Sequence, residues 1–250
     1  KAGPRPIRGA AGVPHPAPWS AVLSSPHRWT RDEKPMRAFI TFEGIEGSGK
    51  TTQTQLLSER LERSGTEHVL TREPGGTRAG NQIRHLLLDP ANRDLSPLCE
   101  LLLYQAARAQ HLARVIVPAL AEGKLVLCDR YKDATRAYQG KGRQLPEELV
   151  EQLNRVDLLA LEPDLTLLFD LEPDAALSRA RRREGSASSE QSRFEQEAMD
   201  FHRRVREAYL SLAALCPQRI RVVDAAGSVD QVQERVLAVL KKAFPALNVA

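Results

Sequence analysis

The feature that most constrains this chain is the segment 38–43, a run of apolar and β-branched residues that ends in Glu43 and leads directly into residues 44–51. The second segment reads Gly-Ile-Glu-Gly-Ser-Gly-Lys-Thr and matches the phosphate-binding pattern G-x-x-x-x-G-K-[ST]. Glycines let such a loop curl so that backbone N–H groups point at the phosphates of a nucleotide, and the following helix adds its positive end. Leucines at 56, 57 and 61 recur at helical spacing. The sequence therefore predicts a strand, a phosphate-binding loop and a helix, in that order.

Within this loop, the residue types predict individual contacts to a nucleoside triphosphate. Lys50 is expected to reach the β- and γ-phosphates, and Thr51 to bind Mg²⁺ through its hydroxyl. A glycine-rich turn without a ligand is the structural alternative. The nucleotide is expected to contact the loop and the first turn of the helix, namely Gly44, Ile45, Glu46, Gly47, Ser48, Gly49, Lys50, Thr51 and Thr52.

Residues 1–35 differ in composition from the rest of the chain. They contain seven prolines and show neither a period of 2 nor one of 3.6, so we expect a disordered leader. Six basic and two acidic residues give the leader a charge of +4, which equals the formal net charge of the whole chain. Residues 36–250 are therefore expected to form a neutral domain, and no nucleic-acid partner is predicted. An organelle transit peptide and an upstream extension of the reading frame, ending before Met36, both remain open for the leader.

Membrane insertion and secretion are not expected. No apolar run approaches the roughly 18 residues that a spanning helix needs, and no secretory signal pattern is present. Cys99, Cys128 and Cys216 are odd in number, far apart and in apolar settings. We therefore expect buried, reduced thiols and a cytoplasmic location.

Strand and helix patterns alternate along the domain. Strands are expected at residues 38–43, 68–71, 124–129, 164–170 and 219–224. Helices are expected at residues 51–61, 78–88, 96–122, 132–139, 146–159 and 228–243, with a kink near Pro118 in the long one. This alternation predicts an α/β fold with a five-stranded parallel sheet and helices on both faces.

Two further features point to the site. Asp129 falls at the carboxyl end of a predicted strand, which is where a doubly wound sheet presents its ligands. Residues 178–193 are expected to begin as an arginine-rich helix, which runs into a stretch of glycine and serines that cannot pack a core. A solvated surface loop would explain that composition. We favour a short mobile lid, at about residues 179–193, that brings guanidinium groups over a transferring phosphoryl group.

Four more motifs occur in order after the loop. They are Thr-Arg-Glu-Pro-Gly-Gly-Thr at 71–77, Tyr-Gln-Ala-Ala-Arg at 104–108, Asp-Arg-Tyr at 129–131 and Ala-Tyr-Gln-Gly at 137–140. With the loop, they resemble those of the thymidylate kinases, a family of P-loop nucleoside monophosphate kinases, over about residues 37–240. The resemblance implies a P-loop NTPase fold and the ATP-dependent phosphorylation of dTMP to dTDP, usually by a homodimer.

The resemblance also implies roles around the transferring phosphoryl group. Glu46 would approach the acceptor deoxyribose near its 3′-hydroxyl, and Arg72 would hold the acceptor 5′-phosphate. Arg130 would bridge the phosphates of the two nucleotides. Asp129 would bind Mg²⁺ or its waters, or assist the acceptor. The alternative for Asp129 and Arg130 is a simple ion pair at the end of a strand.

Recognition of the base is implied for two pairs of residues. Tyr104 would stack on thymine and Arg108 would bond to a thymine carbonyl, and their spacing of four residues places both on one helix face. Thr135 and Gln139 have the same spacing and are expected to face the base. A tyrosine at the edge of the core beside a solvated arginine is the alternative for the first pair.

The chain departs from the family pattern at the loop and in the lid. Some members carry an arginine directly after the acidic residue of the loop, where this chain has Gly47. The lid is then expected to supply the catalytic guanidinium, as in bacterial members. Arg183 matches best, ahead of Arg179, Arg181 and Arg193. Ala134 stands where serine is frequent.

Other functions remain open at this point. A P-loop kinase for another nucleoside monophosphate, or for a nucleoside, would share the donor site and differ only around the base. A catalytically silent P-loop homologue would share the fold. A GTPase switch fails on context, because the nearest guanine-reading motif, at residues 154–157, lies inside a helical pattern and precedes the D-x-x-G at 224–227.

Overall fold

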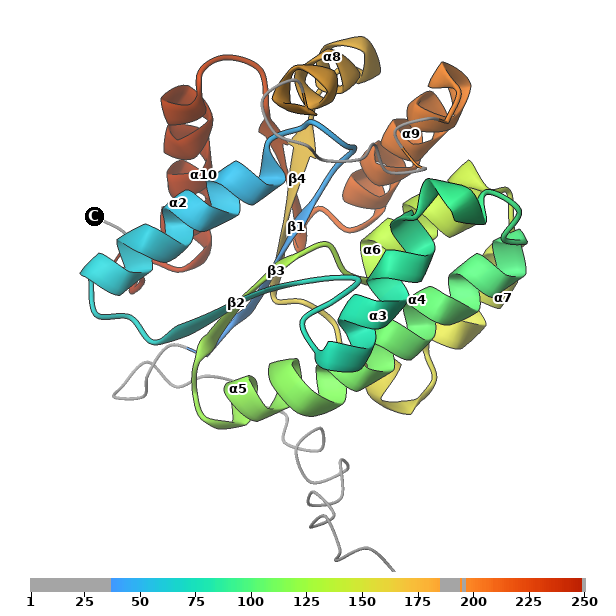
Figure 1. Cartoon of the computed structure of the whole chain (residues 1–250). Coiled ribbons are helices and arrows are strands. Elements are labelled where there is room, and N and C mark those ends of the chain that lie inside the picture. Colours follow the sequence, from blue (N-terminus) through green and yellow to red (C-terminus); the bar gives the residue numbers. More distant parts are fainter. Residues whose placement is uncertain (1–36, 185–193, 195–196, 249–250) are drawn as a thin grey trace, which may run out of the picture. The chain divides into compact units, whose positions relative to one another are not determined.

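The computed structural model describes residues 37–184, 194 and 197–248 of the chain (Figure 1). The expected leader, 1–35, lies outside the described residues, and so does most of the expected lid. The boundary at residue 36 therefore stays a prediction.

A five-stranded sheet, in which all neighbouring strands run parallel, forms the centre of the described structure (Figure 1). Its strand order is β2-β3-β1-β4-β5. The strands are β1 Phe39–Glu43, β2 His68–Arg72, β3 Leu125–Asp129, β4 Leu165–Asp170 and β5 Ile220–Asp224. All five predicted strands and the parallel sheet are confirmed. Connections leave β1 and β3 in opposite directions along the sheet, so a crevice is expected at their carboxyl ends.

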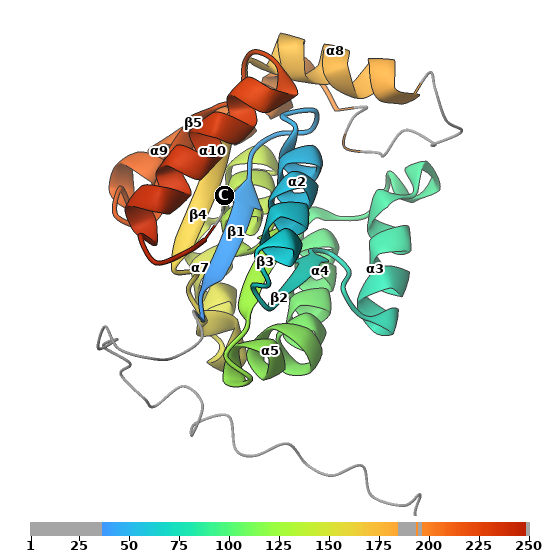
Figure 2. The same ribbon diagram turned by 90° about the vertical axis from the view of Figure 1, so that its left-hand side faces the viewer.

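Helices cover both faces of the sheet, as predicted (Figures 1 and 2). One face carries α2 Lys50–Arg63 and α10 Val229–Ala243, which contact each other. The other face carries α4 Pro97–His111, α5 Val117–Ala121 and α9 Met199–Leu215. Helix α3, Arg78–Leu88, packs against α4.

Two predicted helices contain wider, π-type turns. The predicted helix 96–122 is divided into three consecutive segments. They are α4, a π segment at Leu112–Ile116, and α5. The π segment ends just before Pro118, whose missing N–H and ring cannot fit a regular α turn. The predicted helix 132–139 consists of α6, Lys132–Thr135, and a second π segment, Arg136–Gly142.

The remaining helical segments are shorter. The predicted helix 146–159 is α7, Glu147–Asn154, followed by a 3₁₀ turn at Asp157–Ala160. Another 3₁₀ turn spans Pro90–Asn92. Helix α8, Pro173–Glu184, contains the start of the expected lid.

The sequence analysis missed α9 altogether. Phe201, Val205 and Tyr209 recur at a spacing of four residues and are buried at 3% exposure or less, so the helical signal was present. Because α9 reaches the site through Tyr209, the omission also removed a site residue from the prediction.

The prediction of buried thiols is wrong for two of the three cysteines. All three are free, but only Cys128 is buried, while Cys99 and Cys216 are partly exposed. Across the described ranges, no helix combines the length and the apolar character that crossing a membrane requires.

Candidate active site

The phosphate-binding loop connects β1 to α2 and depends on left-handed backbone. Gly47 and Gly49 have φ of 74° and 89°. A Cβ atom at Gly47 would also overlap the backbone carbonyl of Ala176 in α8. An arginine side chain therefore cannot be placed at this position without moving α8, which explains why the chain has glycine there.

Lys50 is folded back onto the loop. Its Nζ donates to the carbonyl oxygens of Gly44 at 2.9 Å and Ile45 at 2.7 Å, and the side chain is 6% exposed. Removal from water and the nearby charge of Arg130 lower the pKa of Lys50 to about 8. The ammonium group thus lies at the loop and lines the central pocket.

Asp129 and Thr51 meet beside the loop. The Thr51 hydroxyl donates to Asp129 Oδ2 at 2.8 Å, and Asp129 Oδ1 is a buried oxygen without a hydrogen-bond partner among the described residues. A hydroxyl next to an unpaired carboxylate oxygen fits a hard cation such as Mg²⁺, which prefers oxygen ligands. No group of three or more His, Cys, Asp or Glu side chains with metal-binding geometry occurs among the described residues.

Arg130 follows Asp129 and has an unusual backbone. Its φ is 69°, a left-handed value that a residue with a side chain adopts only where its surroundings enforce it. The guanidinium donates to Glu46 Oε1 and to the carbonyl of Gly44, both at 2.9 Å, and lies 4.9 Å from the ring centre of Tyr138. Arg130 therefore joins the phosphate-binding loop to the segment after β3.

Glu46 is held from two sides. Besides Arg130, it accepts a hydrogen bond from the Tyr138 hydroxyl at 2.7 Å. Burial works to raise the pKa of Glu46, but the charges of Arg130 and Lys50 and the Tyr138 hydroxyl outweigh it, so the pKa lies below its ordinary value. The carboxylate is therefore ionised and fixed at the edge of the pocket.

Arg108 is buried, at 1% exposure, so the alternative of a solvated arginine is wrong. Its Nε donates to Glu73 Oε2 at 2.7 Å and its Nη2 to Thr135 Oγ1 at 2.8 Å. Two weaker bonds run from Nη1 to Gln105 and Asn154, at 3.3 and 3.4 Å. A guanidinium has five N–H groups and these bonds use four, so one N–H on Nη2 has no partner among the described residues and could donate to a ligand.

The other residues expected at the base line the same pocket as Arg108. Tyr104 lies one turn before Arg108 on α4, and its ring is 6.5 Å from that of Phe194. Gln139 donates to Glu100 Oε1 at 2.7 Å, so its amide is held by a fully buried carboxylate. The structure thus brings Tyr104, Arg108, Thr135 and Gln139 together.

A second arginine, which the sequence analysis missed, lies near Arg72. Both Arg72 and Arg84 line the pocket, and Arg84 donates to the carbonyl of Pro74 at 3.2 Å. Desolvation, followed by the charge of Arg72, lowers the pKa of Arg84. Arg84 lies six residues into α3, and nothing in its spacing distinguished it from a solvated arginine.

One pocket joins these groups. It is lined by Glu46–Thr52 without Ser48, by Asp129 and Arg130, and by the four base-side residues. Ser48 itself is buried and bonded to Lys50 Nζ at 3.2 Å. The loop and the base side therefore share one continuous space.

The expected lid is described only at its start. Arg183 lies near the end of α8, and its side chain is outside the described part of the structure. Arg179 donates to the carbonyls of Ala225 and Gly227, at 2.9 and 3.4 Å, and so ties α8 to the loop after β5. Arg181 is exposed on α8, and Arg193 lies outside the described residues.

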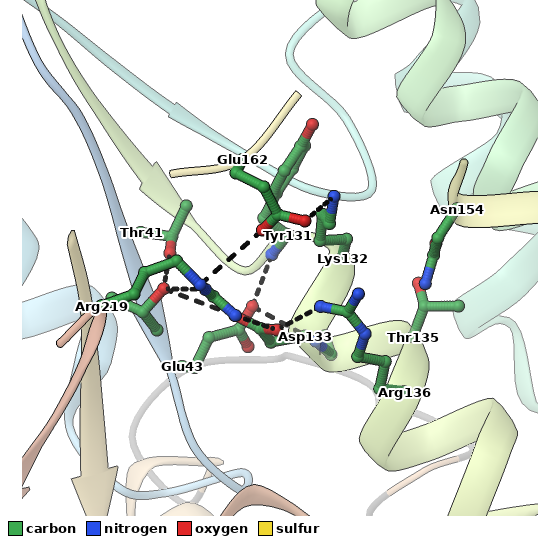
Figure 3. A network of polar contacts seen from close by, with 12 residues as sticks. Thr41, Glu43, Tyr131, Lys132, Asp133, Thr135, Arg136, Asn154, Glu162 and Arg219 are labelled. Carbon is green, nitrogen blue, oxygen red and sulfur yellow. Dashed lines mark hydrogen bonds and ion pairs between the residues drawn. The ribbon is translucent and has the colours of Figure 1, made fainter. Parts of the chain in front are cut away.

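A buried polar network supports the segment after β3 (Figure 3). Glu43 Oε1 accepts from the backbone N–H of Tyr131 at 2.7 Å, and Glu43 Oε2 accepts from the Tyr209 hydroxyl at 2.7 Å. Asp133 binds the guanidinium groups of Arg136 and Arg219. None of these supports was predicted, and all but the pair of Asp133 and Arg136 join residues far apart in the sequence.

Comparison with known proteins now identifies the family. The family model described as thymidylate kinase matches residues 42–236. The chain belongs to the thymidylate kinase family. A thymidylate kinase of Pelobacter propionicus is 55% identical over 204 residues, which cover 81% of this chain and 93% of the relative. One from Desulfosudis oleivorans is 54% identical over 212 residues, covering 84% and 99%.

A solved structure agrees with this assignment. The crystal structure of a thymidylate kinase from Ehrlichia chaffeensis has a TM-score of 0.66 with this chain and is 36% identical. The match covers 82% of this chain and 99% of that one. The thymidylate kinase fold therefore extends over the part of the chain that carries the site.

Proposed function

We propose that this chain transfers the γ-phosphoryl group of ATP to the 5′-phosphate of dTMP and forms dTDP and ADP. The observation that carries this proposal is the shared pocket, in which the phosphate-binding loop and the buried Arg108 line one space. Membership of the thymidylate kinase family and the names of the relatives support the same acceptor. No observation favours another monophosphate, a nucleoside, or a silent homologue.

The acceptor is already an anion, so the reaction needs little general-base help. A phosphate oxygen of dTMP attacks the γ-phosphorus, the bond from that phosphorus to the β,γ-bridging oxygen breaks, and ADP leaves with the electron pair. The difficulty is to bring two polyanions together in line. Lys50 and Arg130 supply positive charge around the migrating group, and Arg72 holds the acceptor phosphate.

Base selection falls to the opposite end of the pocket. Tyr104 offers a ring for stacking, and the remaining N–H of Arg108 donates to a thymine carbonyl. Thr135 and Gln139 complete this side. Glu46, held by Arg130 and Tyr138, accepts from the 3′-hydroxyl of the acceptor sugar.

Thr51 and Asp129 would hold Mg²⁺, because they present a hydroxyl and an unpaired carboxylate oxygen at the loop. The cation supplies charge neutralisation for the phosphates. We further propose a homodimer. Leu98 and Leu102 lie one turn apart on α4 and are 46% and 49% exposed, so this face of the helix could contribute to the contact between the two copies.

A coupled assay of ADP release, with Mg²⁺ and ATP, tests the proposal. The acceptors are dTMP, dUMP, dCMP, dGMP, UMP and thymidine, each supplied separately. We expect a strong preference for dTMP. Preference for another acceptor would overturn the assignment of the base site, and no turnover with any of them would overturn the activity.

A further inference from the structure

His111 is a fully buried residue that none of the roles above uses. It lies at the end of α4, one turn after Arg108, with 0% exposure. Both ring nitrogens are within hydrogen-bond distance of a side chain. Nδ1 lies 3.1 Å from Glu73 Oε1, and Nε2 lies 2.7 Å from Thr71 Oγ1.

The two partners of His111 flank Arg72. Thr71 precedes this arginine and Glu73 follows it, so one imidazole ring fixes the residues on both sides of the proposed phosphate ligand. Gly76 closes the turn over the same ring. A Cβ atom at Gly76 would overlap His111 Nε2, and the φ of Gly76 is 73°. The turn and the ring therefore pack at a distance that only glycine allows.

Glu73 carries the connection on to Arg108. Its Oε1 faces His111, and its Oε2 accepts from Arg108 Nε at 2.7 Å. Both partners project from α4 at a spacing of three residues, which places them on one helix face. Burial works to raise the pKa of Glu73, but the charge of Arg108 and the bond from His111 outweigh it, so the pKa is lowered and the carboxylate is ionised.

The bonding pattern determines the protonation of the ring. An ionised carboxylate only accepts, so Nδ1 carries a proton and donates to Glu73. In the neutral ring, Nε2 then accepts from the Thr71 hydroxyl. A neutral ring with its proton on Nε2 would place a lone pair against the carboxylate and lose the stronger of the two bonds.

We propose that His111 is a positioning residue that holds Arg72 in place relative to Arg108, and thereby supports binding of the acceptor nucleotide between them. The ring acts only through Thr71 and Glu73 and touches neither substrate. This inference rests on the proposed function, since Arg72 and Arg108 define the two ends of the acceptor. Loss of His111 should therefore weaken dTMP binding without affecting ATP.

Three substitutions separate the two bonds. His111→Asn places an amide N–H where Nδ1 lies and keeps the bond to Glu73. His111→Gln reaches the position of Nε2 and keeps only the bond to Thr71. His111→Leu removes both, and His85→Asn, at an exposed position on α3, is the matched control.

The measurements are KM for dTMP, KM for ATP and kcat, together with dTMP binding by calorimetry. We expect His111→Leu to raise KM for dTMP about tenfold or more, which is what the loss of a hydrogen bond to a charged group is worth. His111→Gln should behave similarly, whereas His111→Asn should stay within about threefold of the wild type, because charge-assisted bonds contribute most. KM for ATP should be unchanged in all variants.

Two outcomes would overturn the proposal. One is an unchanged KM for dTMP in His111→Gln and His111→Leu. The other is an equal rise of both KM values, which would indicate a general structural defect. If His111→Leu does not fold, the comparison of the Asn and Gln variants still decides. If the wild type does not phosphorylate dTMP, the proposed function fails, while calorimetry with dTMP still tests the role of His111.

Discussion

Glu43 offers a quantitative test of the buried network beneath the phosphate-binding loop. Its carboxyl is fully buried, and the bonds it accepts come from the N–H groups of Tyr131 and Ala134 and from the hydroxyl of Tyr209. Desolvation, followed by the charge of Asp133, raises the pKa of Glu43 to about 7, although Arg130 and the hydrogen bonds oppose this. The group is thus harder to ionise in the folded than in the unfolded chain.

The sign and size of the effect follow from proton linkage. The ordinary pKa of a glutamate side chain is 4.5, and that of Glu43 in the folded protein is about 7. Between these two pH values, the folded state binds more protons at Glu43 than the unfolded state does. Stability is therefore lost as pH rises through this window. Each pH unit of the window is worth about 1.4 kcal/mol, so ionisation of Glu43 costs the folded protein about 3 kcal/mol by pH 8.

Glu43→Gln removes this titration while keeping a side chain of the same shape. We expect the free energy of unfolding of the variant, minus that of the wild type, to rise by about 3 kcal/mol between pH 4.5 and pH 8. Any cost of the altered hydrogen bonds is independent of pH and appears only as a constant offset.

Urea unfolding at half-unit steps of pH measures this difference, and other titrating groups cancel because both proteins share them. Glu59→Gln, at an exposed position on α2, is the matched control. The reasoning would be refuted if the free energy of unfolding of Glu43→Gln, minus that of the wild type, stayed constant or fell as the pH rises over this range.

Two other predictions concern α8. Gly47→Ala should lower the free energy of unfolding more than Gly49→Ala does. Both positions have a left-handed φ, so that cost is shared. A Cβ atom at position 47 would meet the Ala176 carbonyl, whereas nothing lies within 4 Å of a Cβ atom at position 49. Left-handed backbone alone costs about 1–2 kcal/mol, so equal losses by urea unfolding would contradict the close approach of α8. Arg183→Ala should lower kcat by about 10³-fold or more with little change in dTMP affinity, as for other arginine fingers. A near-normal kcat in that variant, together with a large loss of kcat in Arg181→Ala, would show that Arg181 supplies the guanidinium in place of Arg183.

The parts of the structure that were predicted correctly are encoded in contiguous residues. The apolar run of β1, the glycine spacing of the loop and the helical period of α2 can each be read within a few residues. The parallel sheet follows from the alternation of such segments. The same holds for the gathering of Tyr104 with Arg108 and of Thr135 with Gln139, because a spacing of four fixes a shared helix face.

The parts that were not predicted depend on contacts between distant residues. A buried Arg108 requires Glu73, which is 35 positions away, and the sequence does not say which carboxylate it will meet. The buried Glu43 needs Tyr209 from α9, a helix that the prediction omitted. The close approach of α8 to Gly47 likewise depends on tertiary packing, and it explains why glycine stands where some family members carry arginine.

The end of β1 connects the two halves of the pocket mechanically. Three consecutive residues there accept hydrogen bonds from the segment after β3: Phe42 O from Arg130 N, Glu43 Oε1 from Tyr131 N, and Gly44 O from the Arg130 guanidinium. These bonds hold Arg130 in its left-handed conformation, which a residue with a side chain adopts only at a cost. Since Gly44 begins the phosphate-binding loop, the loop cannot shift without disturbing Arg130. The end of β1 therefore fixes the position of Arg130 relative to the phosphate-binding loop, which is the geometry that would bring the donor phosphate to the acceptor.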